Sequence, residues 1–200
     1  MSRARAFDRS AGRARVGFVC VLVVWDGEDA MSQEEAPREE ALRRGLLGRC
    51  VHHLREEYLP RIERALEVLP PGDLWWRPND DATSVGNLLL HLEGNVRQWI
   101  LSGLADVEDR RARSTEFSAS QSPAGQGAPE LFSALAATVE EACEVIEGLS
   151  GESLLRTRDI QVFEGVSGLA AVVHVVEHFA WHTGQIAWIA KMRAGAGHGL

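Results

Sequence analysis

The chain has 200 residues and a formal net charge of −8, with 45% hydrophobic and 25% charged residues. That length suits a single domain with a buried core, and the composition excludes a disordered chain. The excess of acidic side chains gives no electrostatic attraction to nucleic acid or anionic lipid, so we expect neither nucleic acid nor a membrane as a partner. The three cysteines (Cys20, Cys50 and Cys143) form no CxxC pair. This usage fits a reducing compartment, and we expect a cytoplasmic protein.

Residues 1–30 differ in composition from the rest of the chain. Five arginines between residues 3 and 15 precede an apolar run, Val16 to Trp25, that is too short to cross a bilayer. Acidic residues follow this run, where a signal peptide would need small residues at its cleavage site, although a signal peptide is the alternative interpretation. A new register opens at Met31. We therefore predict that residues 1–30 are a non-native or disordered extension and that residues 31–200 form the domain.

Apolar residues recur with helical spacing in four stretches of the chain. The predicted helices span about 38–69, 84–101, 129–146 and 167–192. Pro60 should kink the first helix, Ser84 is a candidate N-cap for the second, and Pro129 suits the first position of the third. The fourth helix is apolar nearly all round, which predicts that it is buried.

The segments between these helices complete the predicted fold. Residues 105–128 are charged and then rich in serine and glycine, and connectors of this length are usually either disordered or functional. Residues 152–165 are irregular, with a short extended piece beginning near Arg158. Trp75 and Trp76 precede the second helix, and we expect them to cover one end of the domain. The sequence thus predicts an all-α fold, a four-helix bundle with one long crossover connector.

The fourth helix places polar side chains in an apolar surface. His174, His178 and His182 follow one another at intervals of one helical turn, and Gln185 continues the same stripe. A buried imidazole must be hydrogen-bonded or bound to a metal, because otherwise it loses the free energy of its hydration. Three such histidines in a row favour a metal site, whereas a single core histidine is more often structural.

A second polar stripe lies on the predicted second helix. His91, Asn95 and Gln98 flank the apolar face of that helix, so His91 could meet His178 and His182 in the bundle core. Three imidazole nitrogens would leave a fourth coordination position open, as in catalytic metal sites. Zinc, nickel and ferrous iron all accept imidazole ligands, and the sequence does not choose among them. His174 would then lie beside the ligands or be a core histidine.

Several other patterns carry less chemistry. The string from His174 to His178 matches the H-x-x-E-H motif of some metallopeptidases, but a small all-α chain lacks their substrate cleft. Cys50 and Cys143 lie on apolar helix faces and are interpreted as core residues, not nucleophiles. The arginines of the connector are either solvated or folded over the site to bind an anion. These arginines are Arg110, Arg111 and Arg113, and the histidines expected to be exposed are His52, His53 and His198.

Two segments resemble the DinB/YfiT-like superfamily. They run from Ser84 to Trp99, with His91 and Asn95 inside, and from His174 to Gln185; the similarity extends through the stretch from Asp109 to Phe117. The resemblance implies a four-helix bundle that binds one divalent metal ion. By this resemblance, one ligand comes from the second helix and two from the fourth, which are His91, His178 and His182 in this chain.

The resemblance also implies a class of activity. Characterised relatives include S-transferases that use the low-molecular-weight thiols bacillithiol, mycothiol or glutathione, and a mycothiol-dependent maleylpyruvate isomerase. Many relatives carry His-Arg-Gly-Gln where this chain has His182-Thr-Gly-Gln185, so another arginine, Arg156 or Arg158, would have to replace the missing one. A homodimer is a further expectation from the family.

We therefore expect a metal-dependent enzyme that transfers a low-molecular-weight thiol to an electrophilic small molecule. The metal would bind the thiol sulfur and favour its thiolate form. His174, Asn95 and Gln185 are expected to contact the ligands or the substrate. The alternatives are a metal-dependent hydrolase that uses the same three histidines and a non-catalytic metal-binding or stress-response protein.

Overall fold

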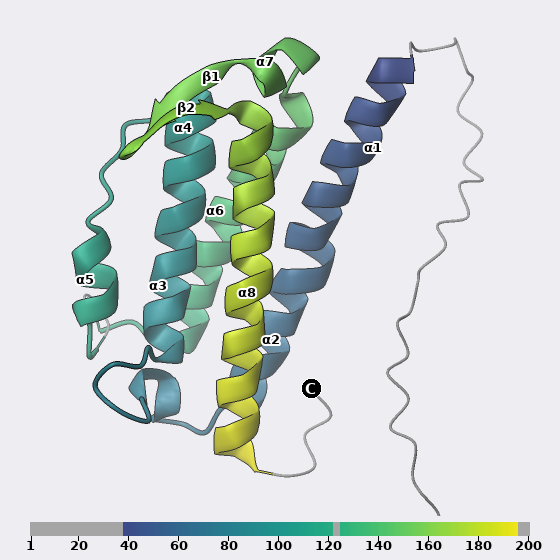
Figure 1. Cartoon of the computed structure of the whole chain (residues 1–200). Coiled ribbons are helices and arrows are strands. Elements are labelled where there is room, and N and C mark those ends of the chain that lie inside the picture. Colours follow the sequence, from purple (N-terminus) through teal and green to yellow (C-terminus); the bar gives the residue numbers. More distant parts are fainter. Residues whose placement is uncertain (1–37, 122–124, 196–200) are drawn as a thin grey trace, which may run out of the picture. The chain divides into compact units, whose positions relative to one another are not determined.

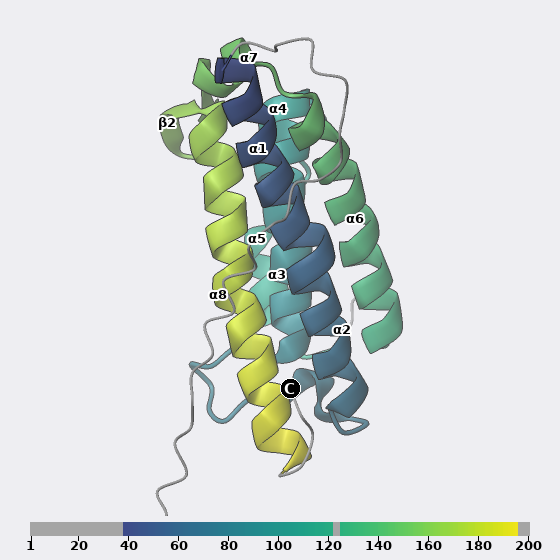
Figure 2. The ribbon, with the colours of Figure 1, turned by 90° about the vertical axis from the view of Figure 1, so that its right-hand side faces the viewer.

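The structure, a computed structural model, describes residues 38–121 and 125–195, so the prediction for residues 1–30, as well as Cys20 and His198, lies outside it. The described part is mostly helical, and four long helical segments pack side by side in it (Figure 1 and Figure 2). This confirms the predicted all-α fold. These segments are α1 (Arg38–His52) continued by η1 (His53–Tyr58) and α2 (Leu59–Val68); α3 (Val85–Val96) continued by η3 (Arg97–Ser102) and α4 (Gly103–Ala105); α6 (Ala128–Gly148); and α8 (Gly168–Ala194). No helix among these residues is long and apolar enough to cross a membrane.

The first segment passes Pro60 without ending. The wider π-helical turn η1 comes directly before α2, and Pro60 is the second residue of α2. Proline has no backbone N–H and its ring clashes with the carbonyl one turn earlier, so a widened turn at this place relieves both conflicts. The helix therefore continues to Val68, close to its predicted end at residue 69.

The second segment begins as the sequence predicts and ends later. The hydroxyl of Ser84 accepts a hydrogen bond from the backbone N–H of Asn87, and the Asn87 side chain accepts one from the Ser84 N–H, which is a reciprocal cap. A π-helical turn, η3, carries the segment past residue 101 to Ala105, where Asp106 adopts a left-handed conformation and stops it. The short helix η2 (Asp73–Trp75) precedes this segment, and Trp75 and Trp76 pack against the core as predicted.

The second and third segments run in the same direction. In Figure 1, α4 and α7 (Gly151–Leu155), which follow α3 and α6, lie at the same end of the bundle. The connector after α4 must therefore return along the length of the bundle before α6 can begin. It carries the short helix α5 (Arg113–Ser118), which packs against α3. The Asn87 side-chain N–H group donates to the carbonyls of Glu116 and Ala119, each at 2.8 Å, and so fastens the connector to α3.

The predicted extended piece is an antiparallel hairpin. Strands β1 (Thr157–Ile160) and β2 (Phe163–Ser167) pair at the end of the bundle and lead into α8. The hydroxyl of Ser167 accepts a hydrogen bond from the Ala170 N–H and caps α8.

The prediction that the fourth helix is buried nearly all round is wrong. Phe179 and Ile186 are fully buried in the core, but Trp181 is 69% exposed and Trp188 is 60% exposed. The bundle covers α8 on the side that faces α2 and α3, and no described residue covers the side that carries the two tryptophans. Apolar composition alone does not show which face of a helix meets the core.

Both described cysteines are core residues, as predicted. Burial raises the pKa of Cys143 to about 12 and also raises the pKa of Cys50. Because the thiolate is the reactive form, iodoacetamide should label neither residue in the folded protein between about pH 7 and pH 10, and should label both after denaturation. Mass spectrometry of peptides from the labelled protein reports each cysteine separately. Rapid labelling of Cys143 in the folded state would contradict its assignment to the core.

Candidate metal centre

The structure brings the three predicted histidines together. His91 lies on α3, and His178 and His182 lie one turn apart on α8, which packs against α3. One ring nitrogen of each residue can be chosen so that all three lie within 4.8 Å of one another. His91 Nε2 and His178 Nε2 are 2.9 Å apart. In the described part of the chain this is the group of side chains that could hold a metal ion.

Hydrogen bonds fix the orientation of two of these rings. His182 Nδ1 lies 2.6 Å from Oε1 of Gln185, which can only accept, so Nδ1 carries the proton and Nε2 keeps its lone pair. His91 Nδ1 lies 2.8 Å from Oε2 of Glu116, a carboxylate oxygen that accepts as well. In both residues the lone pair is thus on Nε2, one of the two ring nitrogens through which histidines bind metal ions.

The surroundings keep the rings on α8 uncharged. Burial, together with the smaller effects of the neighbouring rings of His182 and His91, lowers the pKa of His178 to about 3. Burial also lowers the pKa of His182, although the bond to Gln185 acts in the opposite direction. A neutral imidazole is the form that binds a metal ion, so these two residues need not lose a proton to do so at neutral pH.

Asn95 and His174 form a second polar layer. Asn95 lies one turn from His91 on α3, and His174 lies one turn from His178 on α8. Asn95 Nδ2 is 3.4 Å from His174 Nε2, and the His174 ring lies against Trp99, with 3.9 Å between centroids, and stacks on His178 at 5.4 Å. The Asn95 side chain is 3% exposed, and its oxygen accepts no hydrogen bond from the described residues. The two residues thus lie next to the three histidines, and the Asn95 oxygen is free to accept from a ligand.

Glu116 is a site residue that the sequence did not reveal. It is buried at 7% exposure, and besides His91 it contacts Arg111, whose side chain is only 4% exposed. Burial opposes ionisation of Glu116, but the bonds from Arg111 and His91 outweigh it and lower its pKa. The expectation that the connector arginines are either solvated or bound to an anion is therefore wrong for Arg111, because the buried carboxylate of Glu116 balances the charge of its guanidinium group. Arg110 is exposed and pairs with Glu108, and Arg113 lies over the Phe117 ring.

The other sequence patterns do not join the centre. Glu177 of the H-x-x-E-H string is exposed and is not part of the group that could hold a metal. His52 is exposed as predicted, whereas His53 is half-buried against Tyr58, and both approach Glu57. Arg158 donates to the Gly103 carbonyl at the end of the bundle, and Arg156 is exposed there. Of the arginines, only Arg111 has a contact with one of the three histidines among the described residues.

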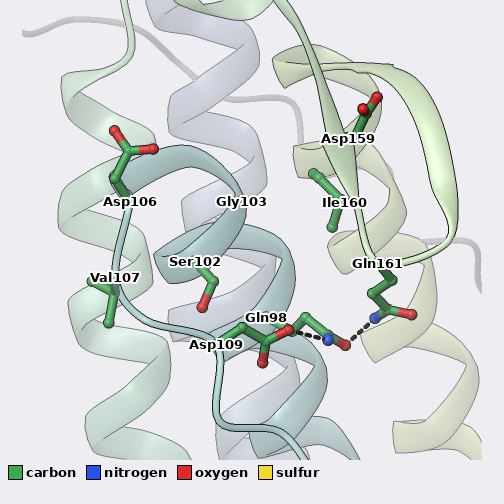
Figure 3. Close-up of a pocket in the computed structure, with 9 residues that line it drawn as sticks. All are labelled: Gln98, Ser102, Gly103, Asp106, Val107, Asp109, Asp159, Ile160 and Gln161. Atoms are coloured by element: carbon green, nitrogen blue, oxygen red, sulfur yellow. Dashed lines mark hydrogen bonds between the residues drawn. The ribbon is translucent and has the colours of Figure 1, made fainter.

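Two of the pockets among the described residues include a residue that is hydrogen-bonded to the surroundings of the centre. One of about 340 Å³ lies between η3, the connector and the hairpin, and its lining residues include Asp106, Asp109 and Asp159 (Figure 3). Gln98, which lines it, bonds to Asp109 and Gln161 and so ties all three segments together. The other, of about 260 Å³, shares Gln185 with the histidine centre. Its further lining residues are Pro78, Asp81, Ala82, Thr83, Trp188 and Ile189.

The fold and the site define a class of protein. It is a bundle of four helical segments, the second and third of them parallel, with three histidines that could hold a metal ion. A family model for the DinB superfamily matches residues 52–186, which include all three histidines and the connector. The chain belongs to the DinB superfamily. No curated protein matches it in sequence.

Proposed function

We propose that this protein is a divalent-metal-dependent enzyme that transfers a low-molecular-weight thiol to an electrophilic small molecule. The observation that supports this best is the set of three imidazoles, His91, His178 and His182, with nitrogens within 4.8 Å of one another. A set of three protein ligands leaves a coordination position for an external molecule, whereas structural zinc sites use four. Zinc, nickel or ferrous iron suits these ligands.

The residues present fit such an ion. Gln185 and Glu116 hold the Nδ1 protons of His182 and His91, so the Nε2 atoms are available as ligands. A divalent ion held there would lower the pKa of a bound thiol and so favour a thiolate nucleophile at neutral pH. In the transfer, the sulfur forms a bond to an electrophilic carbon, the leaving group departs with the bonding electron pair, and the thiol proton passes to solvent.

The second polar layer and the smaller pocket supply places for the reactants. The buried Asn95 oxygen accepts an N–H or O–H group of a bound molecule. The pocket beside Gln185 offers the Trp188 ring as an apolar wall and Asp81 as a negative charge. We infer that the electrophile occupies this pocket, because Gln185 joins it to a ligand histidine. A Trp188→Ala variant would then raise the KM for the electrophile with little change in the metal content.

The test is a metal-dependent transferase assay. Protein expressed from Met31 without a tag is loaded with zinc, nickel or ferrous iron and given a chromogenic aryl halide with cysteine, glutathione, bacillithiol or mycothiol. We expect turnover with at least one thiol, loss of turnover on chelation, and recovery when the metal is returned. His52→Ala, which changes an exposed histidine, should leave all three results unchanged.

Each other outcome of this assay contradicts thiol transfer. Full metal binding without turnover by any of the thiols would assign the ion a structural or sensory role. Chelator-sensitive hydrolysis of an activated ester, without thiol transfer, would instead assign the site to water activation.

A further inference from the structure

A buried ion pair on the connector stands next to the histidine centre. Arg111 and Glu116 belong to the charged connector, Glu116 within its short helix α5, yet their side chains are only 4% and 9% exposed. Moving two charges out of water is strongly unfavourable unless each charge is well hydrogen-bonded. The exposed pair on the same connector, Glu108 and Arg110, shows the ordinary arrangement, with side chains 71% and 80% exposed.

Both charged side chains of the pair are hydrogen-bonded, and their hydrogen bonds extend to His91. Arg111 Nε and Nη2 donate to the two carboxylate oxygens of Glu116 at 2.7 Å and 2.8 Å, and Nη1 donates to Gln98 Oε1 at 2.8 Å. Glu116 Oε2 accepts from His91 Nδ1 at 2.8 Å. Arg111 Nη2 also lies 3.0 Å from His91 Nδ1, but we assign the Nδ1 proton to the shorter contact with Glu116, because an unprotonated nitrogen 2.8 Å from a carboxylate oxygen would be repelled.

A glycine in α3 leaves room for Arg111 and Glu116 to lie close to the helix backbone. Gly94 lies less than one turn after His91 on α3, and a Cβ atom there would collide with the Glu116 carboxylate and lie 2.9 Å from Arg111 Nε. Only a glycine lets the pair come this close to the helix. Asn87 holds the connector from the other side through the carbonyls of Glu116 and Ala119. The ring of Phe117, the next residue along the connector, packs on His91 with 4.6 Å between centroids.

We propose that Glu116, held by Arg111, is a positioning residue that orients His91 and keeps its Nε2 lone pair directed at the metal position. A carboxylate bonded to Nδ1 fixes the tautomer and the ring plane and makes the imidazole a stronger donor. The crossover connector is thereby part of the metal centre, although it supplies no ligand itself. This proposal rests on the proposed metal binding, and its test is metal affinity rather than turnover.

The experiment compares zinc affinity, measured by competition with a chelating dye, in wild type and three variants. Glu116→Gln keeps the shape but removes the charge, and Gly94→Ala keeps the carboxylate but moves it. We expect both to weaken binding by about 10- to 100-fold. Glu108→Gln, which removes an exposed carboxylate from the same connector, should change the affinity by less than about threefold.

Two further measurements separate positioning from simple stability. The visible spectrum of the cobalt(II)-loaded protein reports the ligand field, and we expect it to change in Glu116→Gln and not in Glu108→Gln. The melting temperature of the metal-free proteins reports folding alone. If one of the two site variants does not fold, the other carries the test, because one changes charge and the other changes position.

The outcomes distinguish this proposal from the proposed function. If wild type binds zinc and both site variants bind it within about threefold with an unchanged cobalt spectrum, the pair only fastens the connector and the positioning role is wrong. If wild type binds none of the metals, the proposed function itself fails. If binding weakens in proportion to a lower metal-free melting temperature, with the cobalt spectrum unchanged, the positioning role is likewise contradicted.

Discussion

Replacing His178 with alanine should weaken divalent-metal binding by more than about 100-fold, because it removes one of the three proposed ligands and leaves two histidines. His178 lies beside both of the others, with its Nε2 2.9 Å from His91 Nε2 and its ring 4.4 Å from that of His182 between centroids. The fold should survive, since the histidine that is removed is uncharged in the folded protein. Elemental analysis and zinc competition on purified protein measure the loss directly.

The control for this prediction is His174→Ala. His174 lies one turn away on the same helix and stacks on His178, but it is not a member of the group that could hold a metal. We expect this variant to keep stoichiometric metal with an affinity within about fivefold of wild type. Equal loss in the two variants would show that the ligand set is not the one assigned here.

Replacing Phe179 with alanine should destabilise the protein by about 3–5 kcal/mol. The Phe179 ring is fully buried and stacks on Tyr58 at 6.4 Å, so it joins α8 to the first helical segment. Alanine would leave a cavity that the packed helical segments cannot close without moving together. For a chain of this size the melting temperature should fall by roughly 6–20 °C.

Trp181→Ala is the matched control, two residues along the same helix. Trp181 is 69% exposed, so its removal takes little area out of the core and should change the stability by less than about 1 kcal/mol. Differential scanning calorimetry of the two variants compares them under one condition. A large loss in Trp181→Ala would mean that the exposed face of α8 is covered in solution by a second molecule.

The three histidines could be predicted because the spacing of residues in a helix determines which side chains lie on the same face. A spacing of four residues puts His178 and His182 on one face whatever the rest of the fold, and the apolar neighbours of His91 place it toward the core. Gln185 follows from the same rule. A four-residue spacing within a helix thus sets how far apart two side chains lie. This part of the site could therefore be predicted from the sequence alone.

Glu116 and Arg111 could not be predicted, because no comparable spacing rule relates the connector, or the short helix α5 within it, to the helix against which it packs. Their neighbours Glu108, Asp109 and Arg110 are charged, and a run of charges ordinarily indicates a solvated segment. Their burial depends on the connector lying along α3, a tertiary fact that no local pattern encodes. Gly94, within a helix at the side of the histidine stripe, was the available indication of a close approach.

The later end of the second helical segment traces to the π-helical turn η3. In η3 the hydrogen bonds span one more residue than in an α-helix, so the apolar stripe shifts and the helix continues where a regular pattern would end. Gly103 lies inside the continued segment, against Ile160 of the hairpin, although glycine often ends a helix. The low helix propensity of glycine predicts that the helix ends at such a residue, but the packing of the segment against its neighbours outweighs this propensity.

The order of the packed helices constrains how the chain can be made. The first segment packs against α8, and His91 meets its partners only there, although α8 is the last described helix of the chain. Until α8 has been made, a growing chain on the ribosome therefore exposes the apolar faces of α2 and α3 that α8 covers. A chain cut short before α8 would leave these faces in water and would be expected to be a substrate for chaperones and proteases.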